Sequence, residues 1–315
     1  MRYCFIHNPG SNHGRSGKCV PYFQNILKAQ NIAHDYNITS SLAEAAELSE
    51  KANRAGCDCI VAVGGDGTIN RVVNGFYDTS GKRLSNARLG VVHTGTSPDF
   101  CRSYGIPTEP FAALDTVLEG HTVKISVGKV DYRKSQGNRE RLDTRYFSCC
   151  ANIGLGAAVA RYANSGFRRR LGDSSGTLVA ILMALITFKL SPIEIVADGK
   201  TTRIPRNINT FIGKTDFVAS GIKICNNLEL DDKRLYVLTL DDVNWRNVVP
   251  LLRCIYSGAP LRNSRSLSFG YATSVVIEAE SDSYEVEFDG DPQGTLPCTI
   301  SVAEELLDLI VEQRP

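Results

Sequence analysis

Asp66 is the residue whose type and setting point most directly to chemistry. It lies in the turn 64–68, which follows the apolar run 60–63 and precedes a helical pattern of apolar residues. Glycines let the backbone approach a ligand closely, and a helix N-terminus favours phosphate. A carboxylate beside phosphate oxygens is repulsive unless it binds a metal ion or takes up a proton. The turn therefore predicts phosphate chemistry around Asp66, the alternative being an aspartate that only caps the helix. The residues predicted to contact phosphate here are Gly64, Gly65, Gly67 and Thr68.

A second carboxylate, Asp99, follows the next apolar run, 89–93, within the segment Gly95-Thr96-Ser97-Pro98-Asp99-Phe100. Ligands of parallel sheets bind at the carboxyl ends of the strands, and both aspartates come just after such runs. Asp99 could therefore hold Mg²⁺ or order a base. Helix capping is again the alternative.

Two further aspartates stand near the end of the chain. Residues 284–288 alternate in polarity and are followed by Asp289-Gly290-Asp291-Pro292. The alternation predicts a strand that ends in an acidic turn. Its two carboxylates, Asp289 and Asp291, are candidates for a catalytic role. The alternative is an acidic turn without a catalytic role.

The loop 8–18 is rich in glycine, serine and basic residues and lies between a strand pattern and a helical pattern. It is not a P-loop, because Asn12 and Cys19 occupy positions where that motif needs glycine and a hydroxyl residue. Amides and cations at such a place can still bind phosphate. Phosphate contact is one interpretation and a solvated loop is the other. The candidates for contact are Asn8, Ser11 and Lys18.

The elements that position these residues follow from hydrophobic periodicity. In the first third of the chain, strand and helix patterns alternate, which favours a doubly wound parallel sheet. The expected strands are 3–7, 32–39, 60–63 and 89–93, and the expected helices are 22–29, 41–55, 69–77 and 109–119.

Beyond this region, many short strand patterns favour a β-sandwich. We expect one alternating strand at 123–132 and an exposed hairpin loop at 133–144. The end of the chain fits a helix or two strands, and we choose strands. The remaining expectations are strands at 146–153, 193–196, 203–204, 210–212, 235–240 and 274–279, an amphipathic segment at 161–170 and helices at 174–190 and 243–256.

Three segments in order resemble the diacylglycerol kinase catalytic-domain family, which is related to sphingosine and ceramide kinases. They are GGDGTINRVVNG at 64–75, GTSPDF at 95–100 and DGDP at 289–292. The family pattern has Asn where this chain has Pro98 and Glu where it has Asp291. GGDGT alone is shared with NAD kinases and, more loosely, with phosphofructokinases, so the later segments carry the distinction.

The resemblance implies an α/β nucleotide-binding domain at 1–124, a β-rich lipid-substrate domain at 125–299, and a final segment, 300–315, that packs back on the first domain. It implies a kinase of lipid metabolism that transfers the γ-phosphoryl group of ATP to a lipid alcohol such as diacylglycerol, with Mg²⁺, in a pathway such as phospholipid biosynthesis. In bacterial relatives an acidic turn like 228–235 holds a structural Mg²⁺, although Lys233 stands where glycine is common. The implied roles are catalysis by Asp66, Asp99, Asp289 and Asp291; nucleotide binding by Asn8, Ser11, Lys18, Gly64, Gly65, Gly67, Thr68, Gly95 and Thr96; and metal binding by Asp66, Asp99 and Asp231. Among the catalytic residues, Asp291 is the candidate general base for the hydroxyl proton, with Asp289 in support.

Composition narrows the function classes. The chain has 315 residues and a formal net charge of +1, without the strongly basic face of a nucleic-acid binder. The apolar stretch 178–188 is far shorter than the ~20 residues that cross a bilayer. We expect a cytoplasmic protein with free thiols that acts at the membrane surface. The sequence leaves open whether it forms a homodimer. The rival functions are a NAD kinase, which an assay with NAD and ATP would detect, and a catalytically drifted lipid- or nucleotide-binding protein.

Overall fold

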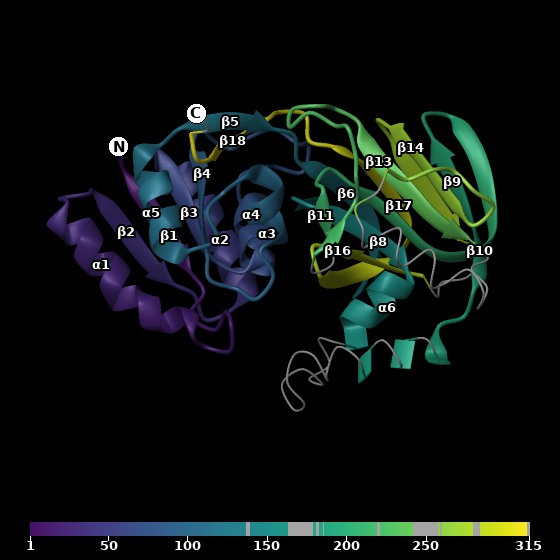
Figure 1. The fold of residues 1–315 in the computed structure, drawn as a ribbon, viewed down its shortest axis with the longest axis horizontal. Coiled ribbons are helices and arrows are strands. Elements are labelled where there is room, and N and C mark those ends of the chain that lie inside the picture. The colour runs from purple at the N-terminus through teal and green to yellow at the C-terminus, as the bar shows by residue number, and fades with distance from the viewer. Residues whose placement is uncertain are drawn as a thin grey trace.

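The computed structural model describes residues 1–136, 139–162, 179–180, 183–184, 186–218, 221–241, 258, 260–279 and 284–313. These residues form an α/β domain and a β-rich domain that lie side by side (Figure 1). Two elements of the sequence analysis, the segment 161–170 beyond residue 162 and the helix 243–256, lie outside the described residues, as does about half of the helix 174–190. Among the described helices, none is both long and apolar enough to span a membrane.

The N-terminal sheet is mostly parallel and has the strand order β2-β1-β3-β4-β18-β5. Strands β1 to β4 and β18 run parallel, and β5 pairs antiparallel with β18. The last strand in the sequence thus lies inside the first sheet. The strands are β1 (Tyr3–His7), β2 (His34–Ile38), β3 (Cys59–Gly64), β4 (Arg88–His93), β5 (Thr122–Ile125) and β18 (Leu307–Ile310).

Helices cover both faces of this sheet because successive strand residues point to opposite sides. Phe5 and Val61 pack with Phe23 of α1 on one face, whereas Ile6 and Ile60 belong to the core on the other face. This confirms the doubly wound α/β domain. The helical elements are η1 (Ser16–Cys19), α1 (Val20–Ala29), α2 (Leu42–Arg54), α3 (Asp66–Asn74), α4 (Asp99–Tyr104) and α5 (Pro110–Glu119).

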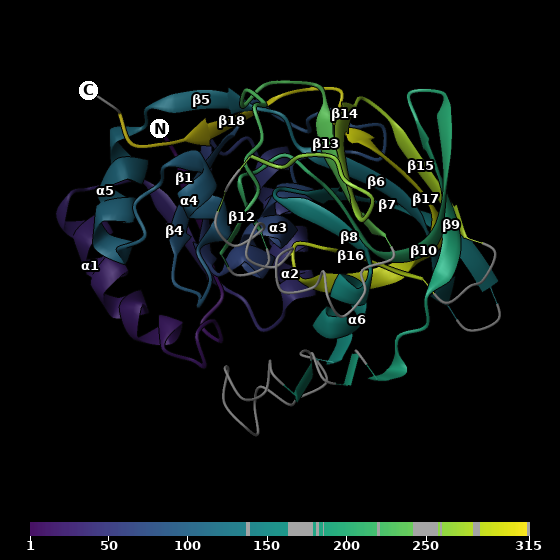
Figure 2. The ribbon, with the colours of Figure 1, turned by 45° about the vertical axis from the view of Figure 1, so that its right-hand side comes forward.

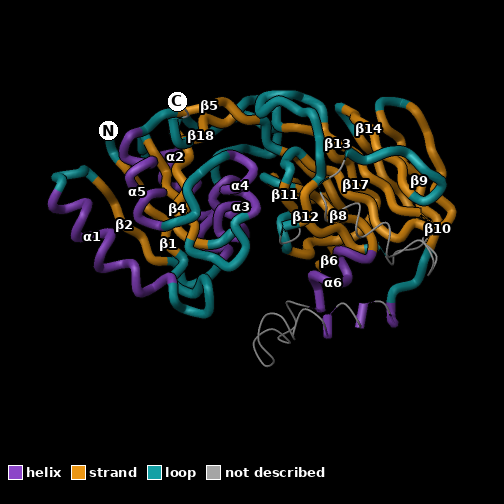
Figure 3. Tube along the Cα trace, in the orientation of Figure 1, coloured by secondary structure: helices purple, strands orange, loops and turns teal. Residues whose placement is uncertain are grey.

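The second domain is almost entirely strands (Figure 3). Its sheet has the order β14-β13-β10-β8-β16-β17-β15-β9, and a further β10–β9 pairing closes part of this path into a barrel-like ring. A long hairpin, β6–β7, is joined to β17, and α6 lies below β8 and β16 in Figure 2. The elements are β6 (Gly128–Gln136), β7 (Arg139–Phe147), β8 (Cys150–Gly154), α6 (Leu155–Tyr162), β9 (Ser191–Ala197), β10 (Lys200–Gly213), β11 (Phe217–Val218), β12 (Ile222–Lys223), β13 (Leu235–Asp241), β14 (Leu267–Ala272), β15 (Val275–Ala279), β16 (Glu285–Phe288) and β17 (Asp291–Val302).

Several expected elements are wrong. The single strand at 123–132 is two strands, β5 and β6, which belong to different sheets. The expected loop at 133–144 is largely the paired strands β6 and β7, since the ladder extends to the pair Gln136 and Arg139. The two short strands at 203–204 and 210–212 are parts of one long strand, β10, which changes partners along its length.

Helices α2 and α3 approach closely at Gly75, which follows α3. A Cβ at this position would lie 2.4 Å from the Cβ of Ser49 and 2.6 Å from the backbone nitrogen of Glu50. Two bonds fix the approach: Ser49 Oγ donates to the Val72 carbonyl at 2.7 Å, and Asn53 Nδ2 donates to the Gly75 carbonyl at 2.9 Å. Since α3 carries Asp66, this contact also sets the position of the glycine turn.

Gly75→Ala is therefore expected to destabilise the protein by about 1–3 kcal/mol, the usual cost of overpacking. Gly67→Ala in the same helix is the control, because its new Cβ would meet only Leu42 Cδ1, at 4.0 Å. Thermal unfolding of both variants tests the contact. Equal melting temperatures for the two variants would contradict it.

Candidate active site

The candidate site lies where the N-terminal sheet changes winding direction. The chain leaves β1 for β2 on one side and returns to β3 on the other, and such sheets bind ligands at the carboxyl ends of the strands beside this point. The loop after β1 and the glycine turn after β3 meet there. Asn8 Nδ2 donates to Thr68 Oγ1 at 3.0 Å, and the Gly65 N–H donates to Ser11 Oγ at 3.3 Å. Four residues predicted to contact phosphate thus come together.

The glycine turns after β3 and β4 touch backbone to backbone. A Cβ on Gly95 would lie 2.4 Å from Gly65 Cα, and a Cβ on Gly64 would lie 2.5 Å from Thr68 Oγ1. Glycine at these positions is therefore required by packing as well as suited to close ligand approach. Thr96 lies beyond the contact and is exposed.

Asp66 and Asp99 meet across these two turns. The backbone N–H of Asp99 donates to Asp66 Oδ2 at 3.2 Å, and Asp99 is only 4% exposed. Neither aspartate occupies the N-cap of its helix, since the N-cap of α3 is Gly65 and that of α4 is Pro98. The capping alternative does not explain why both carboxylates are held here.

Burial raises the pKa of Asp66 to about 8, with further contributions from the charges of Asp99 and Asp289. His93, at the end of β4, lies 3.7 Å from Asp66 Oδ1 through Nε2, and burial lowers the pKa of His93, which favours the neutral ring. Its Nε2 is also 3.0 Å from the Ser97 carbonyl, an acceptor that requires the proton on Nε2. His93 is therefore neutral and does not balance a negative charge on Asp66. Like charges held out of water make this pair a place for a cation.

The donor set fits a magnesium ion. The Oδ1 atom of Asp66 is buried and has no hydrogen-bond partner. Mg²⁺ is commonly held by one or two carboxylates and completes its shell with water and substrate phosphates. Asp66 and Asp99 would supply these carboxylates. Within the described residues, no group of three or more His, Cys, Asp and Glu side chains forms a self-sufficient metal site.

Asp289 joins the two domains at this site. Its carboxylate accepts hydrogen bonds from Asn70 Nδ2 at 2.7 Å, Ser148 N at 2.7 Å and Ser148 Oγ at 2.9 Å. It also accepts from the N–H groups of Cys149 at 2.9 Å and Cys150 at 3.1 Å. Burial raises the pKa of Asp289, and the hydrogen bonds from 148–150 oppose the rise. All five partners donate, so the ionised carboxylate matches the geometry and its oxygens are fully engaged.

Asn70 and Asn74 dock α3 on the second domain, a role that the sequence analysis missed. Both side chains donate to the Tyr146 carbonyl, at 2.9 Å and 2.8 Å, and the Tyr146 N–H returns a bond to Asn74 Oδ1 at 2.9 Å. A signal was present in the sequence, because the two amides stand four residues apart on a helix whose other buried residues are mostly apolar. That spacing places them on one face.

Asp291 follows Asp289 after a two-residue turn in which Asp289 has φ 50° and Gly290 has φ 85°. Positive φ at both central residues is the requirement of a tight type I′ hairpin. The Gly290 N–H also donates to the buried Glu287 carboxylate, which accepts from Asn152 Nδ2 at 2.6 Å. The turn is thus fixed from both sides. The structure describes the backbone of Asp291 but not its side chain.

A buried polar chain anchors the first loop and was also missed. Tyr36 OH lies 2.6 Å from His7 Nδ1, His7 Nε2 lies 2.7 Å from Ser16 Oγ, and Ser16 Oγ lies 2.6 Å from Thr94 Oγ1. Burial lowers the pKa of His7 to about 4, so its ring is neutral. These hydrogen bonds join the middle of β2, the end of β1, the start of η1 and the residue after β4. Lys18 is exposed on η1, and among the described contacts none links it to the glycine turns.

Asp231 lies apart from these residues. It is exposed in the turn before β13, while the neighbouring Asp232 carboxylate pairs with Arg234 at 2.6 Å. The expected metal role of Asp231 therefore stays a prediction.

Comparison with known proteins gives consistent results. Residues 2–130 match the family model described as the diacylglycerol kinase catalytic domain, and residues 150–311 match the one described as the YegS C-terminal NAD kinase beta sandwich-like domain. The chain is 24% identical over 306 residues to diacylglycerol kinases of Staphylococcus aureus strains RF122 and MRSA252, covering 96% of this chain and 90% of each relative.

Solved structures show the same fold. A putative diacylglycerol kinase from Bacillus anthracis superposes with a TM-score of 0.74 at 20% identity, covering 99% of this chain and 97% of that one. Yeast NADH kinase superposes with a TM-score of 0.55 at 11% identity, covering 99% and 84%. At these identities the likeness shows the fold alone, and the two-domain architecture expected from the sequence is confirmed.

Asp66→Asn should change how stability depends on pH. The folded-state pKa of Asp66, about 8, lies above the unfolded value of about 3.9. The folded chain therefore binds this proton more tightly, and the stabilisation is present below pH 4 and lost as pH rises through 8. In the absence of metal and nucleotide, the variant should gain on the order of 2–4 kcal/mol relative to wild type between pH 5 and pH 8.

Thermal and urea unfolding across this pH range measure the gain. Asp115→Asn, a change of an exposed carboxylate on α5, is the control. Parallel pH profiles for wild type and Asp66→Asn would show that Asp66 is not held in a strained charged state.

Proposed function

Because the chain belongs to the diacylglycerol kinase catalytic-domain family with a YegS-type C-terminal domain, we propose that it is an ATP-dependent lipid kinase. The proposed reaction moves the γ-phosphoryl group of ATP to the hydroxyl of a lipid alcohol such as diacylglycerol. In such transfers most of the catalysis comes from positioning and from neutralising the charge on the phosphoryl oxygens. The glycine turns would position the phosphates, and Asp66 and Asp99 would hold the Mg²⁺ that neutralises their charge.

The observation that carries the proposal is the meeting of three acidic segments at one helix. Asp66 begins α3, Asp99 donates to it from α4, and Asn70, one turn along α3, holds the Asp289 turn of the other domain. The phosphate-binding edge of the first domain is thereby placed beside an acidic hairpin of the second. A nucleotide on one side and an acceptor hydroxyl on the other would use this arrangement.

Each part of the site takes a distinct role in this proposal. The turns at Gly64, Gly65, Gly67, Thr68, Gly95 and Thr96, with Asn8, Ser11 and Lys18, bind the nucleotide phosphates. Asp66 and Asp99 would hold Mg²⁺, which when bound neutralises phosphate charge. Asp291 accepts the proton of the acceptor hydroxyl. Asp289, whose oxygens already accept five bonds, is a positioning residue that fixes the hairpin.

A NAD kinase is the second candidate, because yeast NADH kinase shares the fold. The sequence GTSPDF at 95–100 favours the lipid kinase, since it follows that family's second motif. The membrane surface is the proposed place of work, because the acceptor lipids reside there.

A direct transfer assay distinguishes these functions. With γ-labelled ATP and Mg²⁺, label should enter the organic phase when mixed micelles contain a lipid alcohol, and it should not enter NAD. Chelation of Mg²⁺ and the Asp66→Asn substitution should each abolish transfer. Faster labelling of NAD than of every lipid in a panel of diacylglycerol, ceramide, sphingosine and monoacylglycerol would support the rival enzyme, and no transfer to either class would support a binding protein.

Asp291→Asn should slow the chemical step by about 10²–10⁴-fold, the usual worth of a general base. Single-turnover kinetics should show the loss with little change in ATP binding. Asp291→Glu, which places the family's residue at this position, should keep measurable activity. Asp289→Asn is the comparison, and it should lower stability because its amide would face groups that all donate. Full activity of Asp291→Asn with a folded but inactive Asp289→Asn would assign the base to Asp289.

A further inference from the structure

The chain crosses between the domains at Ser126 and Val127, between β5 and β6. This crossing is held by the turn 229–234, which we call the acidic turn. The Ser126 N–H donates to the Leu230 carbonyl at 2.8 Å, and its Oγ donates to the Asp232 carbonyl at 2.7 Å. A second crossing, from β17 to β18, runs alongside, since the Ala303 N–H donates to the Val127 carbonyl at 2.8 Å. The geometry of the acidic turn therefore bears on both connections between the domains.

Lys214 reaches the same carbonyls from the end of β10. It is only 8% exposed, and its ammonium donates to the Asp232 carbonyl and, at 2.8 Å, to the Arg234 carbonyl. A buried ammonium is costly unless its donors are satisfied, so this placement is specific. Burial lowers the pKa of Lys214 to about 8, against the attraction of Asp232, and the charged form still prevails at neutral pH.

The acidic turn has the chemistry of a cation site. Backbone carbonyls that converge beside two aspartates are typical ligands of hard cations such as Ca²⁺ and Mg²⁺. Here the Asp232 carboxylate turns to the Arg234 guanidinium, with both oxygens engaged at 3.1 Å or less, and Asp231 faces solvent. The carbonyls of residues 232 and 234 accept hydrogen bonds from the Lys214 ammonium instead. Because these carbonyls and the Asp232 carboxylate are already engaged, the turn does not fit a metal ion in addition to Lys214.

We propose that the Lys214 ammonium is the built-in cation of the acidic turn, and that it holds the crossing between the domains without a metal ion. The consequence reaches the candidate active site through the residues after Lys214. The Phe217 N–H donates to Ser103 Oγ at 3.1 Å, and that hydroxyl donates to the Asp99 carbonyl at 2.8 Å.

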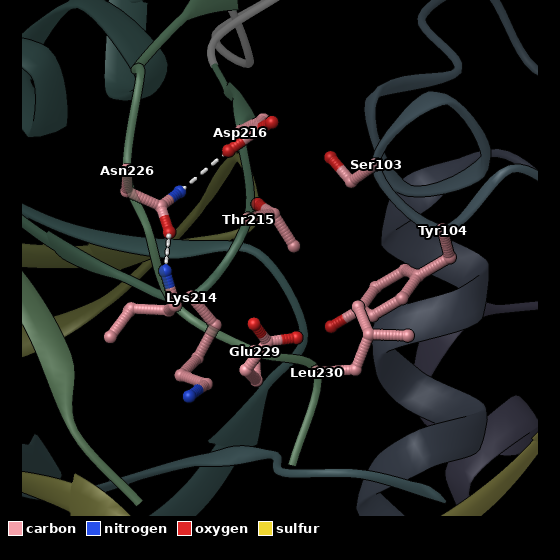
Figure 4. Close-up of a pocket in the computed structure, with 9 residues that line it drawn as sticks. Ser103, Tyr104, Lys214, Thr215, Asp216, Asn226, Glu229 and Leu230 are labelled. Carbon is pink, nitrogen blue, oxygen red and sulfur yellow. Dashed lines mark hydrogen bonds between the residues drawn. The ribbon is translucent and has the colours of Figure 1, made fainter. Parts of the chain in front are cut away.

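A small cavity of about 80 Å³ lies between these segments. Figure 4 shows Ser103 and Tyr104 of α4 on one side and Thr215, Asp216 and Glu229 on the other. Lys214 points away from the cavity centre, toward the strand below it. The cavity is thus a seam between the domains, and Lys214 closes one end of it.

Thermal unfolding with and without metal tests the proposal. The Asp66→Asn background removes a carboxylate from the nucleotide site, so that Mg²⁺ there does not contribute. In this background the chain with Lys214 intact should melt at the same temperature in EDTA and in millimolar Mg²⁺ or Ca²⁺, and the metal-treated, desalted protein should retain less than one equivalent of either ion. A rise in melting temperature of several degrees with either ion, lost on Asp231→Asn, would overturn the proposal.

The matched variants are Lys214→Ala and Lys233→Ala, an exposed lysine of the same turn. Lys214→Ala removes a charge-assisted hydrogen bond from the carbonyls of Asp232 and Arg234, although Ser126 Oγ still donates to that of Asp232. The variant should therefore lower the melting temperature by about 5–10 °C. Millimolar Mg²⁺ or Ca²⁺ should restore part of that loss, and Asp231→Asn should abolish the restoration. Lys233→Ala should leave the melting temperature within about 1 °C. Equal effects of the two lysine variants would contradict the assignment, and if Lys214→Ala does not fold, the metal response of the intact chain decides alone.

Discussion

The arrangement of the two domains depends on the hydrogen bonds that the buried Asp289 carboxylate accepts from both of them. This carboxylate gathers the N–H groups of 148–150 at the turn between β7 and β8 and accepts a bond from Asn70 in α3. Removing one partner from such a buried, charge-assisted group costs more than the bond itself contributes, because the other groups stay desolvated. The same carboxylate therefore stabilises the turn at 148–150 and the hairpin that contains Asp289. It also holds α3, the helix that begins at Asp66, against the second domain. The site is assembled by the contact that joins the domains.

Around this anchor the protein holds groups that oppose its own stability. Asp66 and Asp99 lie together in a buried place with a neutral His93 beside them, and the raised pKa of Asp66 reports the cost. The glycine turns after β3 and β4 leave no room for side chains at Gly64 and Gly95. Natural proteins break local rules of stability mainly at functional sites. The unfavourable features here are buried acidic groups at the carboxyl edge of the sheet. The polar groups behind that edge, such as His7 and Ser16, have hydrogen-bond partners.

The sequence reveals the parts of the fold that rest on simple periodicity. Alternating helices and buried strands predicted the first sheet, and the rule that ligands bind at strand ends predicted that Asp66 and Asp99 lie at one edge. The division of 123–132 into two strands at Ser126 could not be predicted, because alternation indicates which face of a sheet a residue occupies and not which sheet the strand joins. The β6–β7 hairpin and the first half of β10 escaped because polar side chains on both faces leave no apolar period. Contacts such as Asn74 with Tyr146 and Lys214 with Asp232 join residues far apart in the chain, and a pattern of spacing holds no signal for them.

The place of β18 in the first sheet constrains how this protein can be made. Strand β4 pairs with β18, and in the described part of the chain β5 is joined to this sheet through β18. About 180 residues separate β5 from β18, and more than 210 separate β4 from it. During synthesis the first four strands leave the ribosome with the edge of β4 open, and that edge stays open until residue 310 has emerged. Contacts so distant in sequence are slow to form, and open strand edges invite aggregation. The nascent α/β half must therefore wait for the whole β-rich half, and a transcript cut short anywhere before β18 yields a sheet that ends in an unpaired strand.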